Sequence, residues 1–143
     1  MKNRCPDWFQ TYTGRKFNPR TAKEADIDIQ DIAHALSNYC RFGGHSRHFY
    51  SVAQHLCLCY DNIQPICGLK GQALLHDGSE AYLGDVVKPL KLVLPDYQRI
   101  EKRLERIIMR AFKLPAELYP EVKVVVDIVA LATEKRDLML SQP

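Results

Sequence analysis

Apolar residues recur every three or four positions along most of the chain, which predicts amphipathic helices. The first helix is expected to begin at Asp28 and to end before Gly43-Gly44, with Ile29, Ile32, Ala33 and Leu36 on one face. Further helices are expected at about 46–60, 68–82, 96–111 and 121–140. Val52, Leu56 and Cys59 form the inner stripe of the second, and Asp96 is the expected N-cap of the fourth.

Residues 8–25 lack this helical period and contain Gly14 and Pro19, so they predict an irregular or hairpin-like lead-in. A loop is expected between Gly84 and Pro89, and no segment shows the convincing alternation of a strand. The pattern therefore predicts an all-α fold, in one domain that covers residues 1–143.

Composition narrows the class of protein. With 46% hydrophobic and 26% charged residues, the chain has the profile of an ordinary globular protein. Its net charge of +3 suits an anionic substrate but is too small and dispersed for duplex nucleic acid. Neither a membrane span nor a secretory signal is predicted, so a cytoplasmic location is expected. Cys57, Cys59 and Cys67 lie in apolar helical pattern and are interpreted as reduced core thiols.

Several polar residues stand where a packed helix would not favour them. Asp127 interrupts the apolar run 124–132, which predicts a largely buried helix and a carboxylate that needs a compensating lysine, arginine or metal ion. His76 and Asp77 are adjacent at the end of another apolar run, and Glu80 follows one turn later on the same face of the expected helix. His55 is a third case.

Each of these residues alone has an ordinary structural explanation. An isolated His55 or His76 would be a hydrogen-bonded core histidine, and Asp77 would cap a helix. Together, however, the imidazoles and carboxylates are a ligand set that suits a divalent metal ion. A single ion that several of them share would explain all the anomalies at once.

The order H…HD…D resembles the signature of the HD-domain superfamily of metal-dependent phosphohydrolases, which are helical bundles. The stretch 75–89, LHDGSEAYLGDVVKP, is similar to the corresponding stretch in the branch that contains bacterial and phage 5′-deoxynucleotidases. Residues 51–55, SVAQH, resemble that branch's first-histidine helix. Residues 11–19, TYTGRKFNP, resemble the lead-in of a subgroup that usually carries only a general hydrolase label.

The resemblance implies a role for each matching position. His55, His76, Asp77 and Asp127 would ligate one divalent ion, which could be Co, Mn, Zn, Fe or Mg. Glu80 would handle the proton of the attacking water, Arg41 would hold the substrate phosphate, and Asp85 would lie near the sugar and phosphate.

Other positions concern the substrate and the departures from the family pattern. Lys88 or Lys91 would help Arg41 to neutralise developing charge. Phe42 follows Arg41 where deoxynucleotidases typically place tryptophan, and Gly78 replaces a common alanine, which is expected to loosen that helix turn.

Four further polar residues are candidates for a place at or near the metal site. His45 and His48 are expected at the surface or behind the site, and Glu134 could orient a metal ligand or Arg41. Asp137 is the rival of Asp127 as fourth ligand, but its charged surroundings predict exposure. The chain also ends sooner after Asp137 than many relatives, so a segment that helps to close the pocket is expected to be missing.

The expected activity is hydrolysis of a nucleotide phosphate ester, with (deoxy)nucleoside 5′-monophosphates favoured and nucleoside and phosphate as products. One alternative is a triphosphohydrolase that releases polyphosphate from a deoxynucleoside triphosphate. A second is a nucleotide-binding regulatory module without turnover, and a third is a di-iron oxygenase, for which too few histidines converge. The family resemblance also predicts a homodimer.

Overall fold

A computed structural model describes residues 6–140, apart from the side chains of Cys67 and Asp127. This part of the chain is mostly helical, as the sequence predicts. Its elements are β1 (Phe9–Gln10), β2 (Lys16–Phe17), η1 (Glu24–Asp26), α1 (Ile29–Asn38), η2 (Arg41–Gly44), α2 (Val52–Asp61), α3 (Cys67–Leu75), α4 (Glu80–Leu83), α5 (Lys88–Lys91), α6 (Pro95–Ala111), α7 (Pro120–Val124), the π-helical turn η3 (Val125–Ala130) and α8 (Leu131–Leu138). Within residues 6–140, every helix is too short or too polar to cross a membrane.

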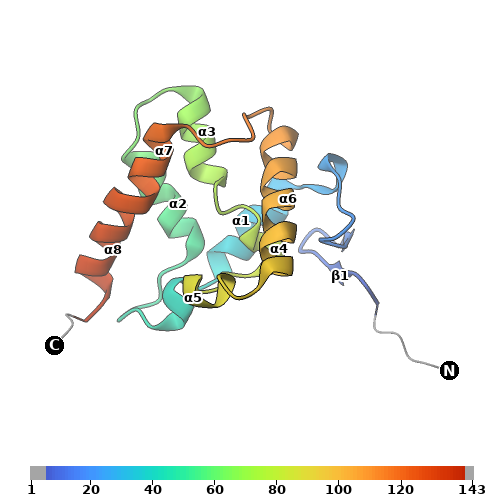
Figure 1. Cartoon of the computed structure of the whole chain (residues 1–143), viewed down its shortest axis with the longest axis horizontal. Coiled ribbons are helices and arrows are strands. Elements are labelled where there is room, and N and C mark those ends of the chain that lie inside the picture. The colour runs from blue at the N-terminus through green and yellow to red at the C-terminus, as the bar shows by residue number, and fades with distance from the viewer. Residues whose placement is uncertain (1–5, 141–143) are drawn as a thin grey trace.

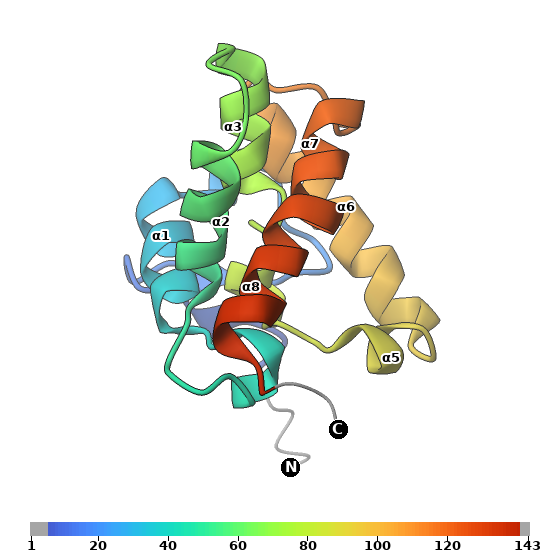
Figure 2. The same cartoon turned by 90° about the vertical axis from the view of Figure 1, so that its left-hand side faces the viewer.

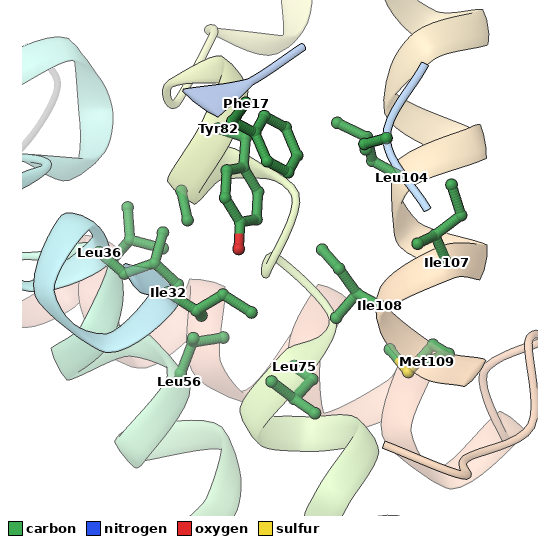
Figure 3. Packing of buried hydrophobic residues seen from close by; sticks show 13 residues of the cluster. Phe17, Ile32, Leu36, Leu56, Leu75, Tyr82, Leu104, Ile107, Ile108 and Met109 are labelled. Carbon is green, nitrogen blue, oxygen red and sulfur yellow. The ribbon is translucent and has the colours of Figure 1, made fainter. Parts of the chain in front are cut away.

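The helices pack around one main apolar cluster. In Figure 1, α7 and α8 follow one another on the left and α6 stands on the right, with α1 to α4 between them. Figure 2 shows α2 running beside α8. The cluster joins side chains of α1, α2, α3, α4 and α6, and the ring of Phe17 from β2 stacks on that of Tyr82 with centroids 4.0 Å apart (Figure 3). Burial of each large apolar side chain stabilises the fold by about 1.5–3 kcal/mol.

The helix starts follow local capping chemistry. The first helix begins at Asp28 as predicted, and Asp28 caps α1 because its side chain accepts a hydrogen bond from the Gln30 backbone N–H. The second helix begins later than the expected residue 46, because Ser51 and Gln54 form a capping box there. The prediction of Asp96 as an N-cap was wrong: Leu94 takes that position, and Asp96 lies in the first turn of α6.

The expected helix over 68–82 is divided in two. The chain leaves α3 at Leu75 and enters α4 at Glu80, with tight turns between them. A Cβ atom at Gly78 would lie 3.0 Å from the Leu75 carbonyl oxygen and 3.3 Å from Ile108 Cγ2, so glycine permits the turn to pack closely against α6. Gly78 therefore allows the turn between α3 and α4 to pack closely against α6. The prediction that this glycine loosens a helix turn was wrong.

The last expected helix is present but differs in two ways. A π-helical turn, 125–130, interrupts it. The prediction that this segment is largely buried is wrong for one of its faces, because Val124, Ile128 and Val129 are 51%, 62% and 38% exposed. The turn touches α2 on its other side. Asp127 belongs to this turn, but its side chain lies outside the described part, so its predicted burial remains a prediction.

The N-terminal lead-in is a hairpin, as expected. Phe9 pairs with Phe17 and Gln10 with Lys16 in a two-residue antiparallel ladder, too short for the alternation that a sequence shows. Arg103 of α6 donates to the carbonyl oxygens of Pro19 and Ala22 at 3.3 and 2.6 Å. Arg103 thus ties α6 to the segment that follows the hairpin.

Candidate metal centre

Three side chains from two segments meet inside the molecule. His55 projects from the middle of α2, and His76 and Asp77 lie in the turn that Gly78 tightens. The Nε2 atoms of His55 and His76 are 3.2 Å apart, and Asp77 Oδ2 lies 3.6 Å from the first and 3.2 Å from the second. These three atoms are called the candidate metal centre below.

Hydrogen bonds on the far side of each imidazole fix where its proton is. His76 Nδ1 lies 2.9 Å from the carbonyl oxygen of Ala73, and His55 Nδ1 lies 2.6 Å from a carboxylate oxygen of Glu134. A carbonyl and an ionised carboxylate only accept hydrogen bonds, so both Nδ1 atoms must carry the hydrogen. In the neutral rings, each Nε2 atom then presents a lone pair.

Two nitrogen lone pairs and a carboxylate oxygen therefore face one another at 3.2–3.6 Å. The two lone pairs and the negatively charged oxygen repel one another unless a cation, either a proton or a metal ion, lies between these three atoms. The charge of Asp77 and its hydrogen bond with His76 outweigh the effect of burial and raise the pKa of His76. Against the same effect of burial, His76, His55 and Arg41 hold the pKa of Asp77 well below its ordinary value.

The chemistry of these donors fits a metal ion. Imidazole nitrogen and carboxylate oxygen suit divalent ions such as Zn²⁺, Mn²⁺ and Co²⁺. The potential ligand atoms of His55, Cys59 and His76 also lie within 4.8 Å of one another, so the buried cluster could hold a metal ion. Cys59 is absent from the ligand set that the sequence predicts, because it lies in the apolar stripe of α2.

The position of the Cys59 sulfur argues for a packing role beside His55. Its Sγ atom is 3.6 Å from Nε2 and 3.9 Å from Nδ1 of that ring. A sulfur bound to an ion on the Nε2 lone-pair axis would be much farther from Nδ1 than from Nε2, so this sulfur instead lies alongside the ring. Burial and the charges of Asp77 and Glu134 raise the pKa of the Cys59 thiol to about 12, which keeps it protonated.

A fully buried carboxylate connects this centre to Arg41. Glu134 of α8 accepts from His55 through Oε1 and from Arg41 Nη2 through Oε2, the latter at 3.1 Å. Arg41 also lies 3.5 Å from Asp77 Oδ2 through Nη1. Burial opposes ionisation of Glu134, but the hydrogen bond from His55 and the Arg41 guanidinium lower its pKa overall. The sequence suggested that Glu134 would orient either a metal ligand or Arg41, and the structure shows that it contacts both His55 and Arg41.

Glu80 is buried next to the centre and lies close to the ammonium group of Lys91. Lys91 Nζ lies 3.3 Å from Glu80 Oε1 and 2.6 Å from Glu101 Oε1. Burial, together with the charges of Asp77 and Asp85, raises the pKa of Glu80 to about 9 in spite of Lys91. Glu80 Oε2 and Arg41 Nε are buried and have no hydrogen-bond partner in the described part of the chain.

A cavity of about 620 Å³ opens onto these groups. Its volume lies within the range of about 300–1,000 Å³ that small-molecule sites occupy. Most of the site residues predicted from the sequence line this cavity: Arg41, Phe42, His55, Asp77, Glu80, Asp85, Lys88 and Lys91. Lys135 and Leu131 of α8 line it as well, which the sequence did not predict because nothing in its pattern indicates which face of α8 meets the cavity.

Other candidates lie apart from the site. His45 and His48 are exposed and do not line the cavity, in keeping with the expected surface role. Asp137 is half exposed and pairs with Arg136, as its charged surroundings predicted. Asp127 stays a predicted ligand, because its side chain is outside the described part.

The chain is similar in sequence to two uncharacterized bacterial proteins. No family model matches it. It is 44% identical over 133 residues to the uncharacterized protein YfdR of Escherichia coli K12, an alignment that covers 93% of this chain and 73% of YfdR. The chain belongs to the YfdR family. It is also 33% identical over 124 residues to an uncharacterized protein of Rhodobacter capsulatus, covering 81% of this chain and 63% of that protein. Both YfdR and this second relative are thus longer than the matched region.

Proposed function

We propose that this chain is a metal-dependent phosphohydrolase of the HD-domain type that acts on nucleotides, with 5′-monophosphates as the favoured substrates. The observation that carries the proposal is the convergence of two imidazole lone pairs and one carboxylate oxygen within 3.2–3.6 Å. The HD-type order of these residues in the sequence supports it independently.

His55, His76 and Asp77 would hold the ion, and Asp127 is the expected fourth ligand from the turn that touches α2. A divalent ion in this position supplies Lewis-acid polarisation of a phosphate oxygen and acidifies water. Asp77 is favoured over Cys59 as a ligand because its oxygen approaches both Nε2 atoms, whereas the sulfur lies alongside one ring.

The chain's own residues would handle charge and protons. Arg41, held by Glu134 and Asp77, presents a guanidinium to the cavity, where it would bind phosphate oxygens. In the hydrolysis, a bond forms between water oxygen and phosphorus, the bond from phosphorus to the 5′ oxygen breaks, and the leaving alkoxide takes up a proton.

Glu80 would move these protons. Its raised pKa depends in part on the negative charge of Asp77, so compensation of that charge lowers the pKa toward the range in which a carboxylate accepts a proton from water. Lys91 holds one Glu80 oxygen and leaves Oε2 without a partner in the described residues. Asp85 lines the same cavity, and its own pKa is raised by burial and by Asp77.

Hydrolysis of a triphosphate is the second candidate. Lys88 and Lys135 line the cavity in addition to Arg41, and the structure pairs neither of them with a carboxylate among the described residues. Additional phosphate groups would find these two ammonium groups within the same cavity.

A substrate screen tests the proposal. Nucleoside mono-, di- and triphosphates are each incubated with Mn²⁺, Co²⁺, Zn²⁺ or Mg²⁺, and phosphate and polyphosphate release are measured separately. We expect phosphate release from monophosphates and its loss in Asp77→Ala, which should stay helical by circular dichroism. Polyphosphate release would favour the second candidate, and nucleotide binding without release of either product would favour a regulatory module.

A further inference from the structure

A second cavity, of about 350 Å³, lies between the N-terminal hairpin, α1 and α4. It shares no lining residue with the cavity at the candidate metal centre. Its walls include four aromatic side chains, an imidazole and one carboxylate, from Phe9, Tyr12, Tyr39, Tyr82, His34 and Asp31.

Tyr82 is buried, but the other three aromatic side chains are unusually exposed for their size. Tyr12 is 63% exposed and its ring stacks on that of His34, with centroids 3.8 Å apart and planes 10° apart. Phe9 and Tyr39 are also more than one third exposed. Burial of aromatic side chains contributes strongly to the free energy of folding and of binding. Several aromatic side chains that stay exposed around one cavity therefore indicate a binding surface.

Asp31 gives this cavity a negative charge. The residue is only 2% exposed, and its two oxygens accept from the backbone N–H and the hydroxyl of Thr13 at 2.7 and 3.0 Å. A carboxylate can accept about four hydrogen bonds, so part of its capacity is left. Buried charges are normally paired, yet no lysine or arginine of the described residues forms an ion pair with Asp31; the nearby Arg15 pairs with Asp28.

We propose that this cavity binds a small organic cation, an alkylammonium or guanidinium group, with Asp31 as its counter-charge. A carboxylate only accepts hydrogen bonds, so it requires a donor, and a cationic donor compensates its charge as well. The faces of aromatic rings carry the negative side of the ring quadrupole, so Tyr39 and the face of Tyr12 that His34 does not cover would attract a cation in the same way. An anion is disfavoured by Asp31, and a neutral ligand would leave its charge uncompensated.

The experiment is an amide NMR titration of the full chain with butylammonium chloride, and with 1-butanol as the neutral probe of matching shape. We expect saturable shifts near Tyr12, Asp31 and His34 with butylammonium, and at least about tenfold weaker binding of butanol. Asp31→Asn should weaken butylammonium binding by about tenfold or more. Asp28→Asn is the matched control: it removes a neighbouring charge that does not line the cavity, and should leave the affinity within about twofold.

Tyr12→Leu is a second variant at an exposed position, and it decides the matter if Asp31→Asn does not fold. It should weaken butylammonium binding several-fold without changing the affinity for butanol by as much. Equal affinities for butylammonium and butanol in the wild type, or no saturable shifts with butylammonium, would overturn the proposal. So would butylammonium binding that both Asp31→Asn, where it folds, and Tyr12→Leu leave unchanged.

Discussion

At the scale of single residues, the hydrogen bond at Nδ1 of each histidine determines whether its Nε2 atom can bind a cation. The Ala73 carbonyl and the Glu134 carboxylate accept hydrogen bonds from Nδ1–H of His76 and His55, which leaves the Nε2 lone pair of each neutral ring available to a cation. The sequence marked these histidines because they interrupt apolar helical pattern. It could not place Cys59 against His55, since a cysteine in an apolar stripe looks like any other core residue.

Glu134 is expected to set the metal affinity without touching the ion. Glu134→Gln keeps the shape but removes the charge that holds His55 and Arg41. Substitution of such supporting carboxylates typically costs about 10–100-fold in metal affinity, and we expect a loss in that range by competition with a chelating dye. Asp137→Asn, at an exposed position of the same helix, is the control and should change the affinity less than twofold. Equal affinities in both variants would contradict the role.

Glu80 should make the metal-free protein less stable as the pH rises. Burial and the charges of Asp77 and Asp85 raise its pKa from 4.5 to about 9 in the folded chain. An acid with a raised folded pKa contributes stability that is full below its unfolded pKa of 4.5 and is lost as the pH rises through about 9.

Glu80→Gln removes this titration. The variant should match the wild type at about pH 4 and exceed it in free energy of unfolding by at least about 1 kcal/mol at about pH 8, as urea denaturation would measure. A difference that stays constant between these two pH values would show that Glu80 titrates normally.

At the scale of the elements, the sequence predicted the helices better than their ends. The start of α1 at Asp28 and the buried stripe of α2 are confirmed. The break between α3 and α4 was missed because it depends on Ile108, far along the chain, which packs against Gly78. The π-helical turn at 125–130 was missed because its side chains fit an ordinary helical period equally well.

Gly78→Ala tests the packing of that break. The added methyl group would lie 3.0 Å from a backbone oxygen and 3.3 Å from Ile108, so we expect a loss of about 1–3 kcal/mol in the free energy of unfolding. Gly68→Ala in α3 is the matched control. Its Cβ atom would meet only Tyr119, at 3.7 Å, so the higher helix propensity of alanine should keep or raise stability. Similar losses in the two variants would refute the packing argument.

At the scale of the whole molecule, the candidate centre joins segments that lie far apart in the sequence. His55 comes from α2, Asp77 from the break after α3, Arg41 from η2 and Glu134 from α8. The sequence predicted that His55, His76 and Asp77 would meet, because each is a polar anomaly in an apolar setting. It left open whether Glu134 would reach a ligand or Arg41, since only the packing of α8 beside α2 decides that.

Because one ion would bridge α2 and the α3–α4 break, its binding should stabilise the entire fold. A ligand that binds only the folded state at 100 times its Kd adds about 2.7 kcal/mol. For a chain of this length, that corresponds to a rise in Tm of about 5–10 °C. Thermal denaturation with and without Co²⁺ measures the rise, and a chelator should reverse it. Asp77→Ala should lower the rise to less than about 2 °C, since the variant loses the oxygen that approaches both Nε2 atoms. A full rise in Asp77→Ala would mean that Co²⁺ stabilises the fold elsewhere, and the three converging atoms would then be held by a shared proton.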